Sequence, residues 1–232
     1  DPEFISADLN EALTQILTAG GELAALVTGL AERRAAEPAD DLVSSLATAN
    51  IDGEQLTPAE LASFFILLVV AGNETTRNAI SHGLLLLTGH PDQRDLLTGD
   101  LDGRIGPAVE EIVRYVSPVI WMRRTLTGDT VLNGHAFRGG DKFLLMYQAA
   151  NRDENVFGAP DTFDITRSPN PHVGFGAAGP HFCLGAHLAR REISAVLREL
   201  LTRVPDIRAA GEPDYLLSSF INGIKHLPCE FG

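Results

Sequence analysis

The chain has 232 residues, of which 44% are hydrophobic and 21% are charged, so it can bury a sizeable core. Its formal net charge of −13 excludes nucleic acid as a partner, because nucleic-acid binding requires a basic surface. The most apolar stretch, Leu61–Val70, is about half the length that a membrane span requires, so no membrane span is expected. The acidic stretch Asp1–Ala7 has no basic start of a signal peptide, which favours a cytoplasmic protein.

The beginning of the chain is predicted to be helical. Leu9–Ala36 is one helix candidate, although three internal glycines weaken it. Asp40 and Asp41 are expected to cap a short helix that ends near Ala49.

A strong helix start follows at Thr57, where a capping threonine precedes Pro58 and Glu60. The apolar pattern then continues without a stop to Gly89, just before His90-Pro91. The first half of this helix is apolar on nearly all sides, which predicts that it crosses the centre of the domain.

The rest of the chain is predicted to be mixed. A helix is expected from about Ile105 to Val116, strands over Trp121–Leu132 and Asp141–Met146, and an irregular segment over Asn151–Pro171. A last helix is expected to begin near Cys183. The fold class is therefore mainly α with small β-sheets (α+β), and residues 1–232 are expected to form a single domain.

The stretch GFGAAGPHFCLGAHLARREI (Gly174–Ile193) contains the spacing G-x-G-x-x-G. Two prolines precede it where a nucleotide-binding turn needs a strand, and no Lys-Ser/Thr pair follows, so a nucleotide site is not expected. Cys183 follows the glycines at or beside a helix start, where unpaired N–H groups stabilise a thiolate. The alternative is a buried free cysteine that acts as a small hydrophobe. The other cysteine, Cys229, lies three residues from the last residue of the sequence.

Two further features lie upstream. Glu74 and Thr75 place an acid beside an alcohol in the middle of the long apolar helix, where burial of polar groups is costly. The alternative is that both face solvent at a bend. Glu111 and Arg114 form an i,i+3 pair on one helix face, which taken alone is common surface decoration.

Taken in this order, these features resemble the cytochrome P-450 family of haem-thiolate monooxygenases. The matching elements are A-G-x-[D/E]-T at Ala71–Thr75, E-x-x-R at Glu111–Arg114, F-x-x-x-R at Phe163–Arg167, and the cysteine loop. The cysteine loop carries one extra residue, so its phenylalanine is Phe175, as in some family members that oxidise sterols and lipids. The resemblance covers the chain from about Leu9 onward and corresponds to the C-terminal part of a whole family member.

The resemblance implies haem b as cofactor, with Cys183 as the axial thiolate whose electron donation favours O–O cleavage. The glycines would then shape the loop that holds the cysteine. Ala71 and Gly72 would leave room for dioxygen, and Glu74 and Thr75 would relay protons to it.

Other roles follow from the same resemblance. The expected haem-propionate residues are His181 and Arg124, with Arg123 as the competitor of Arg124 because neighbours on a strand point to opposite faces. The expected structural triad consists of Glu111, Arg114 and Arg167. The expected substrate contacts are Val70, Ala71, Val119, Ile120 and Ile221.

The implied reaction inserts one oxygen atom from O2 into an apolar small molecule, including lipid- or sterol-like ones. Its electrons would come from an acidic ferredoxin-type donor docked on a basic patch of His187, Arg190, Arg191 and Arg198, and the alternative is an ordinary exposed helix face. Two other functions stay open. One is a haem-binding or structural fragment without catalysis, and the other is a peroxide-dependent enzyme of the same fold, against which the Glu74-Thr75 pair counts.

Overall fold

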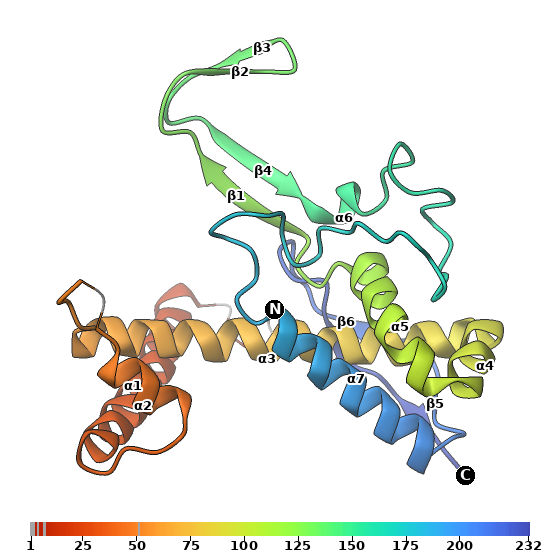
Figure 1. Cartoon of the computed structure of the whole chain (residues 1–232), viewed down its shortest axis with the longest axis horizontal. Coiled ribbons are helices and arrows are strands. Elements are labelled where there is room, and N and C mark those ends of the chain that lie inside the picture. The colour runs from red at the N-terminus through yellow and green to blue at the C-terminus, as the bar shows by residue number, and fades with distance from the viewer. Residues whose placement is uncertain (1–2, 4, 7, 51) are drawn as a thin grey trace. The chain divides into compact units, whose positions relative to one another are not determined.

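The computed structural model describes residue 3, residues 5–6, residues 8–50 and residues 52–232, so the acidic Asp1–Ala7 lies partly outside the described residues. The fold is mainly helical with small two-stranded sheets, which confirms the predicted fold class (Figure 1). The chain divides into two compact units, Asp1–Asn73 and Glu74–Gly232, and each is described by itself. A single domain over residues 1–232 stays a prediction.

The first unit contains two helices with aspartate caps. α1 (Leu9–Ala36) begins where the side chain of Asp8 accepts hydrogen bonds from the backbone N–H groups of Asn10 and Glu11. α2 (Leu42–Thr48) begins where the side chain of Asp41 accepts the N–H of Ser44 at 2.8 Å. Both predicted helices are confirmed, because side-chain acceptors satisfy first-turn N–H groups that have no partner within the helix.

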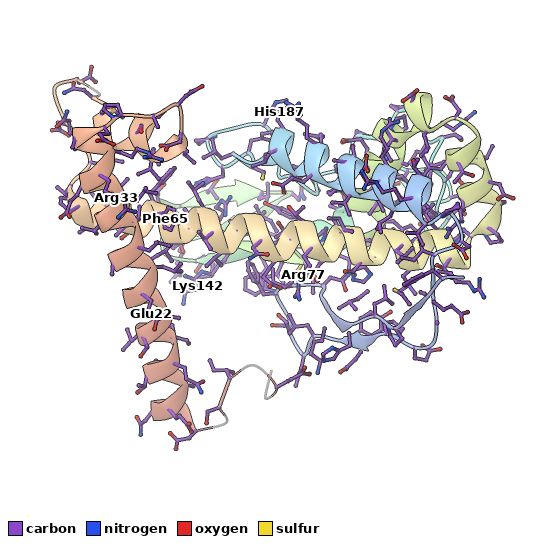
Figure 2. The ribbon with its side chains drawn as sticks, turned by 90° about the horizontal axis from the view of Figure 1, so that it is seen from below. Glu22, Arg33, Phe65, Arg77, Lys142 and His187 are labelled. Carbon is purple, nitrogen blue, oxygen red and sulfur yellow. The ribbon has the colours of Figure 1, made fainter. Side chains whose placement is uncertain are left out.

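α3 (Pro58–Gly89) has both predicted ends. The N–H and hydroxyl of Thr57 each donate to the Glu60 carboxylate at 2.8 Å, and the Glu60 N–H donates back to Thr57 Oγ1 at 3.3 Å. Phe65 lies on the apolar first half of the helix (Figure 2). In that half Leu67 and Val70 are 60% and 59% exposed, and the central position of the helix stays a prediction.

Two of the described helices, α1 and α3, are long and apolar enough to cross a membrane by length and composition alone. Buried core helices of other proteins pass the same test. The expectation of no membrane span therefore stays a prediction.

The second unit is built around α5 (Leu101–Val116), which follows the second half of α3 and α4 (Pro91–Gly99). α5 begins four residues before its predicted start, because the Asp100 side chain caps it by accepting the N–H of Gly103 at 3.0 Å. The sequence analysis did not assign α4. The buried core of this unit consists of Ala79, Leu87, Leu97, Ile105, Ala108, Val109, Ile112, Val113, Val116, Phe163, Ile165, Ile193, Leu197 and Leu201.

α7 (Ala186–Arg203) packs against α5 through Ile193, Leu197 and Leu201. Its N-cap is Gly185, so Cys183 precedes the helix instead of beginning it. Leu184 and Leu188, which the apolar pattern places on the same face, are 76% and 61% exposed.

The strands of the second unit form four antiparallel pairs. β1 (Trp121–Thr125) pairs with β4 (Lys142–Met146), and β2 (Thr130–Leu132) pairs with β3 (His135–Phe137) at the tip of the same ribbon (Figure 1). The single strand predicted over Trp121–Leu132 is therefore wrong, because residues 126–129 between β1 and β2 bend and are not part of a strand. The short pairs β5 (Arg208–Ala209) with β8 (Cys229–Glu230), and β6 (Asp214–Tyr215) with β7 (Ile224–His226), were not predicted.

Between α6 (Tyr147–Ala150) and α7 the chain has neither helix nor strand, which confirms the predicted irregular segment. Asn151 is fully buried at its start. Its side chain donates to the Ser117 hydroxyl and accepts the N–H of Val173, both at 2.8 Å. In this segment, which has no strand hydrogen bonds, the Asn151 side chain therefore supplies hydrogen bonds that a sheet would otherwise make.

Candidate functional site

The Glu111–Arg114 pair on α5 is fully buried, with both side chains 0% exposed. Arg114 donates from Nε and Nη2 to the two carboxylate oxygens of Glu111 at 2.7 and 2.8 Å. Its guanidinium also donates to the backbone carbonyls of Asn151 and Pro160 at 2.8 Å and of Thr162 at 3.1 Å. Since buried charges are stable only when paired and hydrogen-bonded, the surface alternative for this pair is wrong.

The structure brings Arg167 to the same carboxylate. Its Nε donates to both oxygens of Glu111 at 3.2 and 3.3 Å, and its Nη atoms donate to the carbonyls of Gly158, Ala159 and Thr162. Asn170 also donates to Glu111 at 3.1 Å. The three predicted triad residues therefore meet, and together they hold the irregular segment against α5.

A cavity of ≈540 Å³ lies between the segment 172–183, here called the glycine loop, and the β4–α6 corner. It contains both predicted propionate-binding residues, Arg124 and His181, and a backbone wall of small residues from Gly176 to Gly179. Arg124 faces the cavity while Arg123 is exposed, as the alternation of strand β1 requires. The full lining consists of Arg124, Leu144, Leu145, Met146, Tyr147, Ala150, Val173, Gly176, Ala177, Ala178, Gly179, Pro180 and His181.

This cavity has groups that could bind the haem edge, but Cys183 does not line it. Its wall is mostly apolar or backbone, and one guanidinium and one imidazole are placed to meet carboxylates. Gly176 has φ +85°, and a Cβ there would lie 3.5 Å from the His181 carbonyl oxygen in a conformation that side chains disfavour. The lining residues therefore fit the haem edge.

Cys183 is partly exposed and lies two residues beyond His181. Its backbone N–H donates to the Phe175 carbonyl at 2.9 Å, and its carbonyl accepts the N–H of Ala186 at 3.2 Å. Cys183 is not among the residues that line the cavity. Gly174 corrects one expectation about the loop, because its close approach is to α5: a Cβ there would lie 2.5 Å from Val113 Cγ1.

Glu74 and Thr75 are both half-buried. Glu74 accepts a hydrogen bond from Arg77 at 2.7 Å, and these two side chains are 46% and 45% exposed. Among the described residues that line the cavity, neither Glu74 nor Thr75 is found. Ala71, Gly72 and Val70 belong to the first unit and are exposed in the described chain.

The remaining predicted substrate residues meet each other. Val119 and Ile221 form an isolated antiparallel bridge. The Ile120 N–H donates to the Phe220 carbonyl at 2.9 Å, beside that bridge. Segments a hundred residues apart in the sequence are thus brought together.

A second charged cluster on α5 was missed by sequence reasoning. Glu110 accepts from Arg190 Nε and Nη2 at 2.5 and 2.9 Å, and from His172 Nε2 at 2.9 Å. We call Glu110, His172 and Arg190 the Glu110 cluster. The available signal in the sequence was the adjacent pair Glu110-Glu111. Adjacent residues on a helix point in different directions, so these two carboxylates face different surroundings.

The Glu110 cluster also reduces the predicted basic patch. Arg190 is paired with Glu110, and Arg198 is paired with Asp102 at 2.7 Å. His187 lies near the first turn of α7 on its outer side (Figure 2), and Arg191 is exposed.

Glu110 gives the site a pH dependence. Burial alone would raise the pKa of Glu110, but hydrogen bonds from Arg190 and His172 and the charge of Arg190 lower it from 4.5 to about 2. A depressed carboxyl pKa adds stability that is present above the unfolded value and is lost as the pH falls through the folded value.

A Glu110→Gln variant is therefore expected to be less stable than the wild type by on the order of 1–2 kcal/mol at neutral pH, because the 30% exposed carboxylate is partly screened. The difference in free energy of unfolding should shrink as the pH falls from about 4.5 to about 2. Urea unfolding at a series of pH values measures it. A difference that stays constant down to pH 2 would contradict the assignment.

The chain is similar to known proteins over most of its length. A sequence model described as Cytochrome P-450 matches residues 26–204. The chain is 55% identical over 225 residues to a methyl-branched lipid omega-hydroxylase of Mycobacterium tuberculosis, with 97% of this chain and 53% of that protein covered. It is 42% identical over 231 residues to a steroid C26-monooxygenase of Mycolicibacterium smegmatis, with 100% of this chain and 52% of that protein covered.

Among solved structures, a Mycobacterium marinum cytochrome P-450 in complex with pseudoionone superposes with a TM-score of 0.94 at 46% identity. The match covers 100% of this chain and 55% of that chain. The chain therefore spans about half the length of the relatives that it matches.

Proposed function

The chain belongs to the cytochrome P-450 family, and from that premise we propose that it carries the haem-thiolate site of a monooxygenase that inserts one oxygen atom from O2 into an apolar, lipid-like molecule. The observation that carries the proposal is the cavity that contains Arg124 and His181 and ends two residues before Cys183. Catalysis by the whole protein, its substrate and its partners are part of this proposal.

In the proposed site Cys183 would bind the haem iron, and Arg124 and His181 would bind the haem propionates. Haem b supplies the redox chemistry by which O2 is activated, and a thiolate ligand favours O–O cleavage. The small residues 176–179 would let the backbone approach a flat ligand, and tuning of the sulfur by backbone N–H groups is part of the proposal.

Thr75 and Glu74 are proposed to move protons. The Thr75 hydroxyl can donate and accept a hydrogen bond at once, and the Glu74 carboxylate can exchange protons with solvent because it is half-exposed. Arg77 holds Glu74 at 2.7 Å and would fix its rotamer. Ala71 and Gly72, one turn earlier on α3, are proposed to leave room for dioxygen.

The proposed substrate residues are apolar: Val70 on α3, and Val119, Ile120 and Ile221 at the bridge in the second unit. Apolar side chains orient a hydrocarbon by burial alone, without a buried polar group. A lipid-like substrate is supported by the names of the relatives, one a methyl-branched lipid omega-hydroxylase and another a steroid C26-monooxygenase.

Electrons are proposed to come from a ferredoxin-type donor that docks beside α7. Arg191 and His187 are the members of the basic patch that the Glu110 and Asp102 ion pairs leave exposed. An acidic donor would be steered to them by charge. We propose a cytoplasmic location, which suits such a donor.

Haem titration of the chain tests the proposal. We expect one haem per chain and a thiolate-type ferrous–CO spectrum. A colourless protein, or a ferrous–CO spectrum without thiolate character, would refute the assignment. A haem-thiolate chain that binds an apolar substrate and forms no product would instead support the haem-binding fragment without catalysis.

Thr75→Ala is expected to lower the rate of product formation by about 10²-fold or more in the haem-loaded protein, because a proton relay contributes on that scale. Substrate binding should stay unchanged, and the electrons should appear in hydrogen peroxide. Thr75→Ser, which keeps the hydroxyl, should retain most of the coupling. Equal coupling in wild type and Thr75→Ala would show that Thr75 has no part in proton transfer.

A further inference from the structure

The Glu110 cluster joins three separate parts of the second unit. Glu110 lies on α5, Arg190 lies on α7, and His172 lies at the start of the glycine loop. The arginine contact is bidentate, which fixes orientation as well as distance. The His172 side chain is only 3% exposed, so the cluster reaches into the protein interior.

Both partners of Glu110 contact Phe175. The guanidinium carbon of Arg190 lies 4.3 Å from the centroid of the Phe175 ring. The centroid of the His172 ring lies 5.9 Å from the centroid of the Phe175 ring, and the two ring planes are tilted by 50°. His172 Nδ1 also accepts the N–H of Gly174 at 3.1 Å, so Nε2 carries the proton that it donates to Glu110.

Phe175 in turn holds the cysteine. Its carbonyl oxygen accepts the backbone N–H of Cys183 at 2.9 Å, across the loop that includes the cavity wall. Glu110 is therefore connected to Cys183 through the side chains of Arg190 and His172 and the ring and backbone of Phe175. Each residue in this connection directly contacts the next one.

We propose that the Glu110 cluster positions Cys183 for haem: Glu110 orients Arg190 and His172, these two side chains fix Phe175, and the Phe175 carbonyl fixes the backbone of Cys183. Glu110, His172 and Arg190 are positioning residues, since none of them lines the cavity. The inference rests on the proposed function in one respect, namely that Cys183 binds the haem iron.

A matched control lies on the same two helices. Arg198 of α7 donates to Asp102 of α5 at 2.7 Å, and Asp102 is 92% exposed. This ion pair joins α7 to α5 as the Arg190 pair does, but Arg198 donates its hydrogen bonds to Asp102 and to the Leu101 carbonyl, both on α5. Arg198→Gln therefore removes an α5–α7 ion pair and leaves the connection to Cys183 intact.

The experiment compares the whole chain as wild type, Arg190→Gln, Glu110→Gln and Arg198→Gln. The first readout is hydrogen exchange of the Cys183 amide in the haem-free protein. The second is haem affinity together with the ferrous–CO spectrum. Arg190→Gln and Glu110→Gln are expected to speed exchange by about tenfold or more and to weaken haem binding by about 10- to 100-fold. They should also shift part of the CO spectrum away from the thiolate form, and Arg198→Gln should change none of these readouts.

Equal behaviour of Arg190→Gln and Arg198→Gln in all readouts would overturn the proposal. Arg190→Lys keeps the charge but loses the planar bidentate contact, so it should not restore slow exchange, and full restoration would contradict positioning by geometry. If the arginine variants do not fold, Phe175→Leu removes the contacted ring and leaves the ion pair. It should speed exchange at Cys183, and unchanged exchange would count against the proposal.

The two proposals fail separately. A wild-type chain that binds no haem through a thiolate refutes the proposed function. The exchange rate of the Cys183 amide in the haem-free chain still tests whether the cluster holds the loop.

Discussion

Cys183→Ser is expected to remove the thiolate signature from the ferrous–CO spectrum completely, while Cys229→Ser retains it. A serine hydroxyl does not ionise near neutral pH and is a poor ligand for haem iron, whereas a cysteine thiolate binds it directly. The spectrum of the haem-loaded protein measures the effect, with haem content determined on the same sample.

Cys229 is the matched control because it is the chain's other cysteine. It is exposed on β8, and its thiol donates to the Leu227 carbonyl at 3.4 Å. Retention of the thiolate spectrum by Cys183→Ser, or its loss in Cys229→Ser alone, would show that the ligand has been misassigned.

Arg114→Met is expected to lower the free energy of unfolding by about 3–5 kcal/mol, the cost of removing one partner of a buried ion pair. The substitution leaves the buried Glu111 carboxylate with Arg167 as its remaining cation and removes the donor from the Asn151, Pro160 and Thr162 carbonyls. Domains are stable by only about 5–15 kcal/mol, so a large part of the total stability would be lost. Urea unfolding followed by circular dichroism measures this loss.

Arg203→Gln is the control for Arg114→Met. Arg203 pairs with Glu199 at 2.5 Å on α7, but the two side chains are 78% and 57% exposed. Its loss is expected to cost less than about 1 kcal/mol, because solvent screens exposed ion pairs. Comparable losses in the two variants would mean that burial does not determine the role of Arg114.

Local signals in the sequence predicted the elements whose ends are set by neighbouring residues. The capping threonine, proline and glutamate at Thr57–Glu60 predicted the start of α3, and Asp41 predicted the start of α2, because caps act within one turn. The irregular segment after Asn151 was also predictable from its composition. The strand pairs β5–β8 and β6–β7 were not, because strands of two or three residues are too short to show an alternating pattern. α4 was missed although Pro91 at its first position is a local start signal.

The candidate site was likewise predictable only in part. Residue spacing and family resemblance indicated Glu111, Arg114 and Arg167, and the structure brings them together. Apart from the adjacent pair Glu110-Glu111, they gave no sign of the Glu110 cluster, because His172 and Arg190 are 62 and 80 residues from Glu110 in sequence and meet it only when α5, α7 and the loop pack. The pattern also placed Leu184 and Leu188 on a buried face, but Leu184 precedes α7 and Leu188 is not among its buried residues, Ala186, Ile193, Leu197 and Leu201.

Arg114 has a further consequence for the order of events in folding. Its three carbonyl acceptors lie 37, 46 and 48 residues along the chain, so the first contact closes a long loop that includes the whole β1–β4 ribbon. The entropy of loop closure rises only with the logarithm of length and is lost mainly in that first step. Once Asn151 is bound, Pro160 and Thr162 need only short closures, so the later hydrogen bonds form against a much smaller entropic barrier. A single side chain thus turns three distant closures into one cooperative event, and an irregular segment acquires a unique conformation without any secondary structure of its own.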